Sequence, residues 1–454
     1  MRILIILFCV SVSAAQDCST NKAIKIGSQL ELFVDRYLID KMAGVELFMH
    51  EPQRLPMAKS PLQGAYLTVI KDGDIYRGYY RDSRPDYKGP LGDGHSGEIT
   101  CYAESRDGHE WEFPALGILD IRSPFGHNVI LAGEPPGCSH NFSPFLDTRP
   151  GKDRGKRFKA LAGVHSKGGL YAFESEDGIH WIKMQNTPVI TSKNFAFDSQ
   201  NVAFWSQAEN TYLCFFRTWE TPHGKLRTIS RTSSPDFLHW NKPVATNPNR
   251  PMEHLYTSQT HPYFRAPHIY IALPTRYQPD RGSSTDILLM TARAGSASYT
   301  RLFLEAFIRP GLDRERWGNR SNYAALNVVP TGPAEMSIYH FSGHRSVLRT
   351  GGFVSARAGA TEGELLTKTL TFSGSELNLN YSTSAAGSVR VEVQDSVGVP
   401  ISGFLLDDCP AIIGDEIEGR VAWKQKQDLG SLNGRSVRLR FVMIECDLYS
   451  FVFR

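Results

Sequence analysis

The sequence of 454 residues has almost no excess of charge of either sign. Fifty lysines and arginines stand against 47 aspartates and glutamates, which leaves a formal net charge of +3 with histidines neutral. Proteins that bind nucleic acid usually carry a basic face, and solvating tails carry runs of like charge. We therefore expect no nucleic acid among the partners. With 41% hydrophobic residues, a large folded core is expected instead of a fibrous or disordered chain.

Long apolar runs are also missing. The N-terminal stretch, residues 1–15, combines Arg2, a short hydrophobic run and the small residues Ser13, Ala14 and Ala15. It is too short for a membrane span, which needs about 20 apolar residues, but it has the parts of a secretory signal peptide. We expect a secreted or periplasmic protein without a membrane span. An N-terminal core strand is the alternative interpretation.

Signals for cofactors are scarce. Removal of Cys9 with the signal would leave six of the seven cysteines, none in the C-x-x-C spacing typical of zinc sites. We expect most of them to be buried free thiols. No strand–glycine-rich loop–helix unit indicates a nucleotide or a flavin. Calcium is compatible with the Asp-rich loops, but no ligand set stands out. The sequence therefore predicts no cofactor and no metal site.

Helical periodicity is rare, and short β-branched and aromatic runs between Gly, Asp, Asn and Pro turns predict an all-β fold. A repeat organises these runs. Ser105–Trp111 (SRDGHEW) and Ser175–Trp181 (SEDGIHW) are close copies, and Ser234–Trp240 (SPDFLHW) is a looser third. Each follows an expected strand, and Asp-Gly predicts a tight turn with positive φ that the Trp covers. The repeat is therefore interpreted as structural.

Five units of four strands, at intervals of about 57 to 76 residues, predict a five-bladed β-propeller over residues 16–357. An array of β-sandwiches is the alternative. The fifth unit is expected to begin at Glu335. After residue 357, strands with alternating polar and apolar residues predict a C-terminal β-sandwich over residues 358–454.

Propeller geometry narrows the search for a site, because the starts of innermost strands and the ends of second strands open on one face around the axis. Residues at these positions are almost all polar. Expected starts of innermost strands include His140, Asp198, Gln200, Gln259, His261 and Glu335, and ends of second strands include Arg81, Asp82, His165, Arg217, Glu220 and Arg276. Crowded ionisable groups shift one another's pKa values, which is how acid and base roles arise.

We expect Asp198 to act as nucleophile or base and Glu335 as acid, with Asp82 tuning or orienting them. The residues expected to bind substrate are Arg81, His140, Gln200, Arg217, Gln259, His261 and Arg276. Structural alternatives stay open: a turn cap for Asp198, an ion pair with Arg81 for Asp82, packing for the histidines, and orientation of carboxylates for the arginines. Glu305 is expected to pair with Arg309. Trp205, Trp219 and Tyr263 could stack on a sugar or pack in the core.

The order of propeller and sandwich, the Asp-Gly-x-x-Trp hairpins and four segments resemble the five-bladed glycoside hydrolases of families 32 and 43. More closely, the chain is similar to secreted family-32-like proteins of polysaccharide-degrading bacteria. The four segments are His140–Gly151, the stretch around Asp198, Gln259–Pro267 and Val329–Ser337. The resemblance spans about residues 30 to 454 and implies an exported protein that acts on a polysaccharide or oligosaccharide.

The departures from that pattern are specific. Invertase-like enzymes carry a nucleophilic Asp in an Asn-Asp-Pro-Asn box at the first blade, where this chain has Gly64–Leu67 (GAYL) without a carboxylate. Their Arg-Asp-Pro motif has only Arg81-Asp82-Ser83 as a partial counterpart, and Glu445-Cys446, which matches their acid box, falls in the C-terminal region. No invertase catalytic residue is therefore transferred, and fructan is not the expected substrate.

The leading hypothesis is an exported glycoside hydrolase, because glycoside cleavage needs two carboxyl groups in different protonation states. The several cationic residues keep an anionic sugar open as the substrate. A non-catalytic carbohydrate-binding propeller is the second hypothesis, favoured by the missing first-blade Asp. A polysaccharide lyase with a histidine base and Arg217 is the third.

Overall fold

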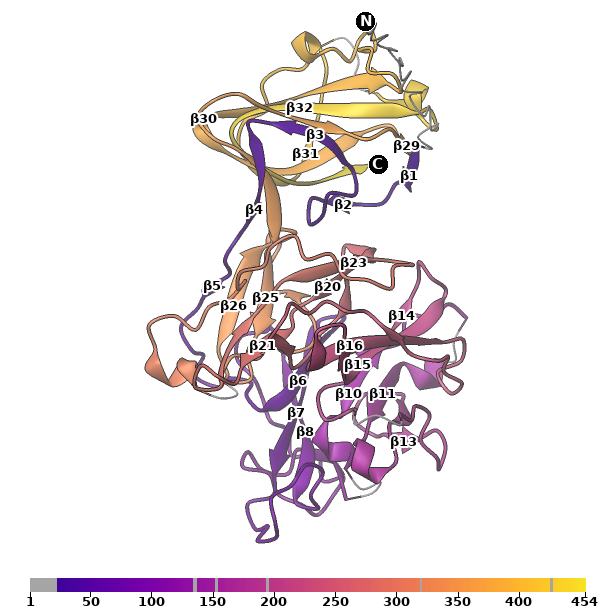
Figure 1. Ribbon diagram of the computed structural model, residues 1–454, viewed down its shortest axis with the longest axis vertical. Helices are drawn as coiled ribbons and strands as arrows, with labels where there is room; N and C mark the ends of the chain where they lie inside the picture. Colours follow the sequence, from indigo (N-terminus) through magenta and orange to yellow (C-terminus); the bar gives the residue numbers. More distant parts are fainter. Residues whose placement is uncertain (1–22, 134–136, 152–153, 193–195, 319–320, 425–427) are drawn as a thin grey trace, which may run out of the picture.

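The computed structural model describes residues 23–133, 137–151, 154–192, 196–318, 321–424 and 428–454; the expected signal peptide and Cys18 lie outside them. The described chain is nearly all β. Its helical elements are short 3-10 turns: η1 (Cys138–His140), η2 (Arg154–Lys156), η3 (His165–Lys167), η4 (Arg314–Trp317), η5 (Leu406–Asp408) and η6 (Gly430–Leu432). Among the described residues, no helix is long and apolar enough to cross a membrane. Figure 1 shows two lobes joined by extended strands.

One lobe, residues 53–349, consists of five successive β-sheet units and is called the five-unit lobe. Units 1 to 3 are four-stranded antiparallel sheets whose strands pair in chain order. Unit 1 contains β6 (Ala65–Asp72), β7 (Ile75–Ser83), β8 (Glu98–Ser105) and β9 (Val129–Ala132). Unit 2 contains β10 (Ser143–Leu146), β11 (Phe158–Ala162), β12 (Tyr171–Ser175) and β13 (Ile182–Lys183). Unit 3 contains β14 (Val202–Ser206), β15 (Thr211–Thr221), β16 (Gly224–Ser234) and β17 (Val244–Ala245).

Unit 4 has interrupted strands, so that two three-stranded sheets continue one another. The first sheet contains β18 (His254–Leu255), β21 (Thr275–Gln278) and β22 (Ser284–Ile287), and the second contains β19 (His261–Tyr263), β20 (Ala266–Ala272) and β23 (Met290–Arg293). Single bridges from Thr300 to Thr291 and from Ile308 to Ile287 take the place of a fourth strand.

Unit 5 corrects the sequence-based assignment of its first strand. It contains β24 (Val329–Pro330), β25 (Glu335–Tyr339), β26 (Arg345–Arg349) and, as its outer strand, β5 (Gln53–Arg54) from the start of the chain. The prediction that Glu335 starts an innermost strand is therefore wrong, because β24 precedes it. Since consecutive strands are antiparallel, the start of β25 lies at the end of the unit away from the starts of the first strands.

The first strands of the five units contact one another in cyclic order. β6 contacts β10, β10 contacts β14, and β14 contacts β19. Unit 4 is joined to unit 5 where the backbone N–H of Val328 donates to His261 Nε2 at 3.1 Å. A parallel bridge between Leu326 and Thr68 then leads back to unit 1. Apolar cores follow the same order; in one, Tyr79 of unit 1 packs with Phe158 of unit 2.

The three sequence repeats form the same turn after the third strand of units 1 to 3. In each copy the Ser hydroxyl contacts the Asp carboxylate, and that carboxylate accepts two backbone N–H groups further along the turn. Gly108 and Gly178 have φ values of 73° and 77°, and Phe237 takes the same left-handed conformation at 72°. The prediction of a structural turn with positive φ is confirmed.

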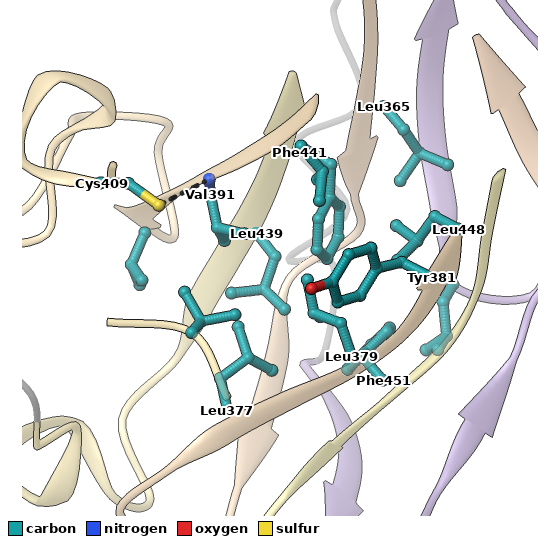
Figure 2. Close-up of a cluster of buried hydrophobic side chains, with 14 of the residues drawn as sticks. Leu365, Leu377, Leu379, Tyr381, Val391, Cys409, Leu439, Phe441, Leu448 and Phe451 are labelled. Carbon is teal, nitrogen blue, oxygen red and sulfur yellow. Dashed lines mark hydrogen bonds between the residues drawn. The ribbon is translucent and has the colours of Figure 1, made fainter. Parts of the chain in front are cut away.

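The other lobe, residues 24–49 and 354–453, is a ten-stranded sheet around β32 (Val437–Phe453) and is called the ten-stranded lobe. β30 (Leu377–Asp395) pairs with β32 along its whole length. The strands along the other edge of β32 are β29 (Leu370–Phe372), β28 (Gly363–Thr367), β27 (Val354–Ala358) and β2 (Glu31–Leu32). The outer strands are β1 (Ile24–Gly27), β3 (Ile39–Ala43), β4 (Val45–Met49) and β31 (Asp415–Arg420). Figure 2 shows part of the apolar core of this lobe.

This sheet changes the expected division of the chain. Residues 16–357 were expected to form one domain, but β1 to β4 and β27 pair within the sheet of the C-terminal strands. The N-terminal strands are short and half-exposed, so their sequence gives no sign of a partner more than 300 residues away. Five of the cysteines lie in the described residues as buried free thiols, which confirms that expectation for them.

Candidate functional site

Asp93, His140 and Asp198 come from three separate loops, yet metal-ligand-type atoms of their side chains all lie within 4.8 Å of one another. His140 ends η1 before unit 2, Asp198 precedes unit 3, and Asp93 lies between β7 and β8 of unit 1. We call these residues the Asp–His–Asp cluster. The structure thus brings together two residues that the sequence singled out and one that it did not.

Two asparagines fix the loop that carries Asp198. Asn141 Nδ2 donates to the carbonyls of Phe197 and Ser199 at 2.6 and 3.0 Å. Asn201 Nδ2 donates to the same two carbonyls at 3.2 and 2.9 Å. Phe197 adopts φ +67°, a left-handed conformation uncommon for a bulky residue. Because both flanks of Asp198 are bonded, its carboxylate is held in place before any ligand arrives.

His140 is buried between a carboxylate and a guanidinium. Its Nδ1 lies 2.8 Å from Glu98 Oε1 and 2.7 Å from Arg81 Nη1, and its Nε2 lies 3.7 Å from Asp198 Oδ1. Burial opposes a charge on His140, but the attraction of the Asp198 and Glu98 carboxylates outweighs burial and raises the pKa of the imidazole. The His140 imidazole therefore interacts with carboxylates and is not a simple packing residue.

The pKa values of the two aspartates in the cluster shift in opposite directions: that of Asp198 is lowered and that of Asp93 is raised. Burial alone would raise the pKa of Asp198, but His140 and Arg217, whose Nη2 donates to Asp198 Oδ2 at 2.5 Å, hold it well below the usual range. Burial and the adjacent charge of Asp198 raise the pKa of Asp93. Adjacent carboxyls with opposite shifts favour one ionised and one protonated group.

Aromatic rings line the cationic side of the cluster. The Arg81 guanidinium lies 4.7 Å from the ring centroid of Tyr66, and the Tyr66 ring meets His140 edge-on at 5.4 Å. Arg217 lies 5.3 Å from the ring of Trp219 and 5.5 Å from that of Tyr256. These contacts desolvate both guanidinium groups while leaving their N–H edges for carboxylates.

A pocket of about 570 Å³ adjoins the cluster. Its lining residues are Met57, Gly64, Ala65, Tyr66, Arg81, Tyr256, Asp313, Glu315, Arg316, Ser321, Tyr323, Phe341, Ser342 and His344. Tyr66 and Arg81 belong both to the pocket wall and to the surroundings of His140. The segment around η4 adds Asp313 and Glu315 to the same wall, with exposed carboxyl groups.

Three expected substrate-binding residues are buried away from this pocket. Gln259 Nε2 donates to Gln200 Oε1 and to the carbonyl of Ala324, both at 2.7 Å, and Gln200 Nε2 donates to Thr68 Oγ1 at 2.9 Å. These bonds join the first strands of four units. His261 is 3% exposed, and burial lowers its pKa to about 4. All three residues form hydrogen bonds between the β-sheet units, and none of them lines the pocket.

Three further expected site residues also lie apart from the cluster. Side-chain alternation places Asp82 on the face of β7 that carries Tyr80, opposite to Arg81; burial raises the pKa of its carboxyl. Arg276 forms a bidentate ion pair with Asp286 at 2.9 and 2.5 Å. Glu335 accepts hydrogen bonds from Thr331 and Arg345 at 2.7 and 3.1 Å.

Other candidates take structural positions. Trp205 and Tyr263 are 6% and 0% exposed and pack in apolar cores. Glu305 lines a separate pocket of about 440 Å³ together with Arg276, Arg309 and Trp317. The pairing expected between Glu305 and Arg309 is not among the ion pairs of the described residues.

The sequence reasoning missed Asp93, Glu98, Tyr66 and Glu315. Strand ends were searched, whereas Asp93 lies inside the 14-residue loop between Ser83 and Glu98. One signal was available: Gly92-Asp93-Gly94-His95 places an acid and a base between glycines in a long loop, and such loops are often functional. Glu315 follows no strand of the propeller pattern and could not be placed without the fold.

The sequence matches no protein-family model and no curated protein. Among solved structures, a family 43 arabinoxylan arabinofuranohydrolase from Bacillus subtilis is 13% identical, with a TM-score of 0.42 over 86% of this chain and 95% of that one. An N-acetylgalactosamine deacetylase from F. plautii is 12% identical, with a TM-score of 0.42 over 88% and 95%. An endo-arabinase from Bacteroides thetaiotaomicron is 10% identical, with a TM-score of 0.41 over 65% and 97%.

Proposed function

We propose that this protein is an exported glycoside hydrolase built as a five-bladed β-propeller and a β-sandwich. The cyclic contacts of the first strands and the completion of unit 5 by β5 support the propeller. The ten-stranded sheet encloses its own apolar core, as a sandwich does. Residues 1–15 support export. In a propeller, the cluster and the pocket lie at the end of the ring where the first strands start.

The observation that carries the proposal is a pocket that is lined by Glu315 and adjoins the Asp–His–Asp cluster through Tyr66 and Arg81. The wall of Tyr66, Arg81 and Tyr256 backs onto Asp198, and the η4 segment contributes Glu315 to the same pocket. Glycoside hydrolysis needs one carboxylate that takes a proton and one carboxyl group that gives a proton. Asp198, next to Arg217, is the ionised member, and Glu315 replaces Glu335 as the proposed acid.

The reaction follows from these positions. A water molecule next to Asp198 adds its oxygen to the anomeric carbon and loses a proton to the Asp198 carboxylate. The bond from the anomeric carbon to the leaving oxygen breaks, and that oxygen receives the proton of Glu315. Arg217, fixed on Asp198, keeps the base ionised between turnovers.

The pocket wall fits a sugar. Tyr323 and Phe341 stack at 5.2 Å, and Tyr256 meets Tyr323 edge-on at 5.5 Å. Such rings offer apolar faces to the C–H groups of a sugar, while Arg81 and Asp313 offer partners for its hydroxyls. Both cationic and anionic groups line the wall, so a neutral or an acidic sugar is accommodated.

The test is a screen of the mature protein on neutral and anionic oligosaccharides, with release of reducing ends as the readout. Asp198→Asn and Glu315→Gln should each lower turnover at least a hundredfold, within the range that general acid–base groups contribute. Asp86→Asn removes an exposed carboxylate from the β7–β8 loop and is the matched control. Full turnover by both site variants would refute the assignment.

A carbohydrate-binding protein without turnover is the second candidate, and one observation favours it. Tyr66, in the left-handed conformation at φ +49°, stands in the first-strand region where related hydrolases carry a nucleophilic Asp. A wild-type protein that binds an oligosaccharide, as seen by calorimetry, but releases no reducing ends would establish this alternative. An unsaturated product absorbing in the ultraviolet would instead indicate a lyase.

A further inference from the structure

Two carboxyl groups and an imidazole nitrogen face one another in the Asp–His–Asp cluster. Two ionised carboxylates at such a distance repel, so the arrangement requires a proton or a cation between them. Arg217 Nη2 binds Oδ2 of Asp198 and leaves Oδ1 directed at His140, whose Nε2 lies 3.3 Å from Arg81 Nη1. A small positive charge between the three side chains would relieve the repulsion between the two carboxylates.

The spacing fits a metal ion better than a direct hydrogen bond. His140 Nε2 and Asp198 Oδ1 are 3.7 Å apart, beyond hydrogen-bonding distance. Ligands of a tetrahedral ion with bonds of about 2.0 to 2.2 Å are separated by roughly 3.4 Å. His140 and Asp198 thus need to approach by only a few tenths of an ångström. Asp93 is exposed and stands between Gly92 and Gly94, so its loop can supply the remaining movement.

An independent observation points to the same ligand. Glu98 is 6% exposed, and its Oε1 lies 2.8 Å from His140 Nδ1, a nitrogen that Arg81 Nη1 and the backbone N–H of Gly94 also approach, at 2.7 and 3.3 Å. In the tautomer in which Nδ1 donates to Glu98, the Nε2 lone pair is directed at the cluster. A carboxylate behind a histidine is the usual second partner of a metal-binding imidazole. The other oxygen of Glu98, Oε2, is buried without a hydrogen-bond partner.

The charges around the cluster leave room for a cation. Asp93, Glu98 and Asp198 carry three carboxyl groups, and Arg81 and Arg217 carry two guanidinium groups. Arg81 Nη1 lies 3.3 Å from His140 Nε2 and must turn away when an ion binds. Glu98, 3.6 Å from Arg81, offers its unpartnered oxygen for that turn.

We propose that Asp93, His140 and Asp198 bind one divalent transition-metal ion, of the zinc or manganese class, with Glu98 orienting His140. This reverses the sequence-based expectation of no metal site. One nitrogen and two oxygen ligands suit such an ion, and three protein ligands leave a position for water, as in catalytic sites. Its chemical use rests on the proposed function: an ion held by these residues would lower the pKa of the water molecule that attacks the anomeric carbon.

The experiment measures metal binding without any substrate. The mature wild-type protein is stripped with EDTA, dialysed and titrated with ZnCl₂ and MnCl₂ by calorimetry, with CaCl₂ as the comparison ion. We expect one site per chain for zinc or manganese. Asp93→Asn and Asp198→Asn should weaken binding more than a hundredfold, and Glu98→Gln, which acts through His140, by about tenfold to a hundredfold. Asp86→Asn, on the same loop as Asp93, should bind like wild type.

Thermal unfolding keeps the test independent of misfolded variants, because zinc or manganese should raise the Tm of wild type and of Asp86→Asn but not of Asp93→Asn. Absence of stoichiometric binding to the stripped wild type, or equal binding by Asp93→Asn and Asp198→Asn, would overturn the metal site. Hydrolysis that persists in EDTA would do the same while leaving the glycosidase intact. Metal binding without hydrolysis of any glycan would instead remove the proposed function and keep the site.

Discussion

The two lobes bury different kinds of side chains. The ten-stranded lobe has a core of aliphatic and aromatic residues, such as Phe441, Phe451 and Trp423, gathered along two long paired strands. The five-unit lobe also buries a polar network, in which Gln259 of unit 4 donates to Gln200 of unit 3, and Gln200 donates to Thr68 of unit 1. The first arrangement is stabilised mainly by burial of apolar surface, whereas the second holds ionisable groups in fixed positions at a cost in stability.

Histidine content follows the same division. All 14 histidines lie between His50 and His344, so residues 24–49 and 354–454 contain none. His261 and His340 are buried in the five-unit lobe, and burial lowers their pKa values to about 4 and about 3. The two histidines with the most strongly lowered pKa values therefore lie in the lobe that carries the candidate site.

The largest effect should come from the apolar core. Phe441 is fully buried among Phe33 and Phe451, so Phe441→Ala should lower the free energy of unfolding by about 3 to 5 kcal/mol. Because the cluster lies in the other lobe, metal binding and turnover should be unchanged at temperatures where the variant is folded. Urea unfolding followed by tryptophan fluorescence, together with the activity assay, measures both. Loss of turnover by the folded variant would show that the core of the ten-stranded lobe and the candidate site are not independent.

An intermediate loss in the free energy of unfolding is expected when the five-unit lobe is acidified. A histidine whose pKa is lowered by folding stays neutral in the folded protein at a pH at which the unfolded chain is protonated. The free energy of unfolding therefore falls as the pH drops below about 6.5. Between pH 7 and pH 5, His261 and His340 should each remove about 2 kcal/mol from the free energy of unfolding. Urea titrations at both pH values, with His261→Gln as the variant, measure this. The variant should lose about half of the pH dependence; an unchanged dependence would show that other groups are responsible.

A smaller effect is expected at the repeated turns. Asp177 accepts hydrogen bonds from the backbone of Ile179 and His180 at 2.8 Å each, and these bonds hold its pKa below the usual range against a desolvation cost. Asp177→Ala should lower the stability by about 1 kcal/mol, the typical value for a lost turn or cap bond. The same change at Asp236 is the matched comparison. A loss as large as that of Phe441→Ala would show that the turns contribute more than local structure.

Much of the fold could be predicted from the sequence because its signals are local. Alternating runs, Asp-Gly turns and the spacing of Trp111, Trp181 and Trp240 predicted strands, units and turns that the structure confirms. The start of unit 5 was wrong, because β24 has only two residues and resembles a loop. The role of β1 to β4 was missed because their partners lie at the other end of the chain.

The sequence by itself determined the all-β character and the repeated units, and it predicted Asp198, His140, Arg81 and Arg217 as site residues, whose side chains the structure places together. Only the tertiary structure decided that Asp93 and Glu98 join them, that Glu335 does not, and that Gln200, Gln259 and His261 are links within the ring. The reason is physical: strand patterns depend on neighbours two residues apart, whereas the cluster depends on where loops from units 1, 2 and 3 meet.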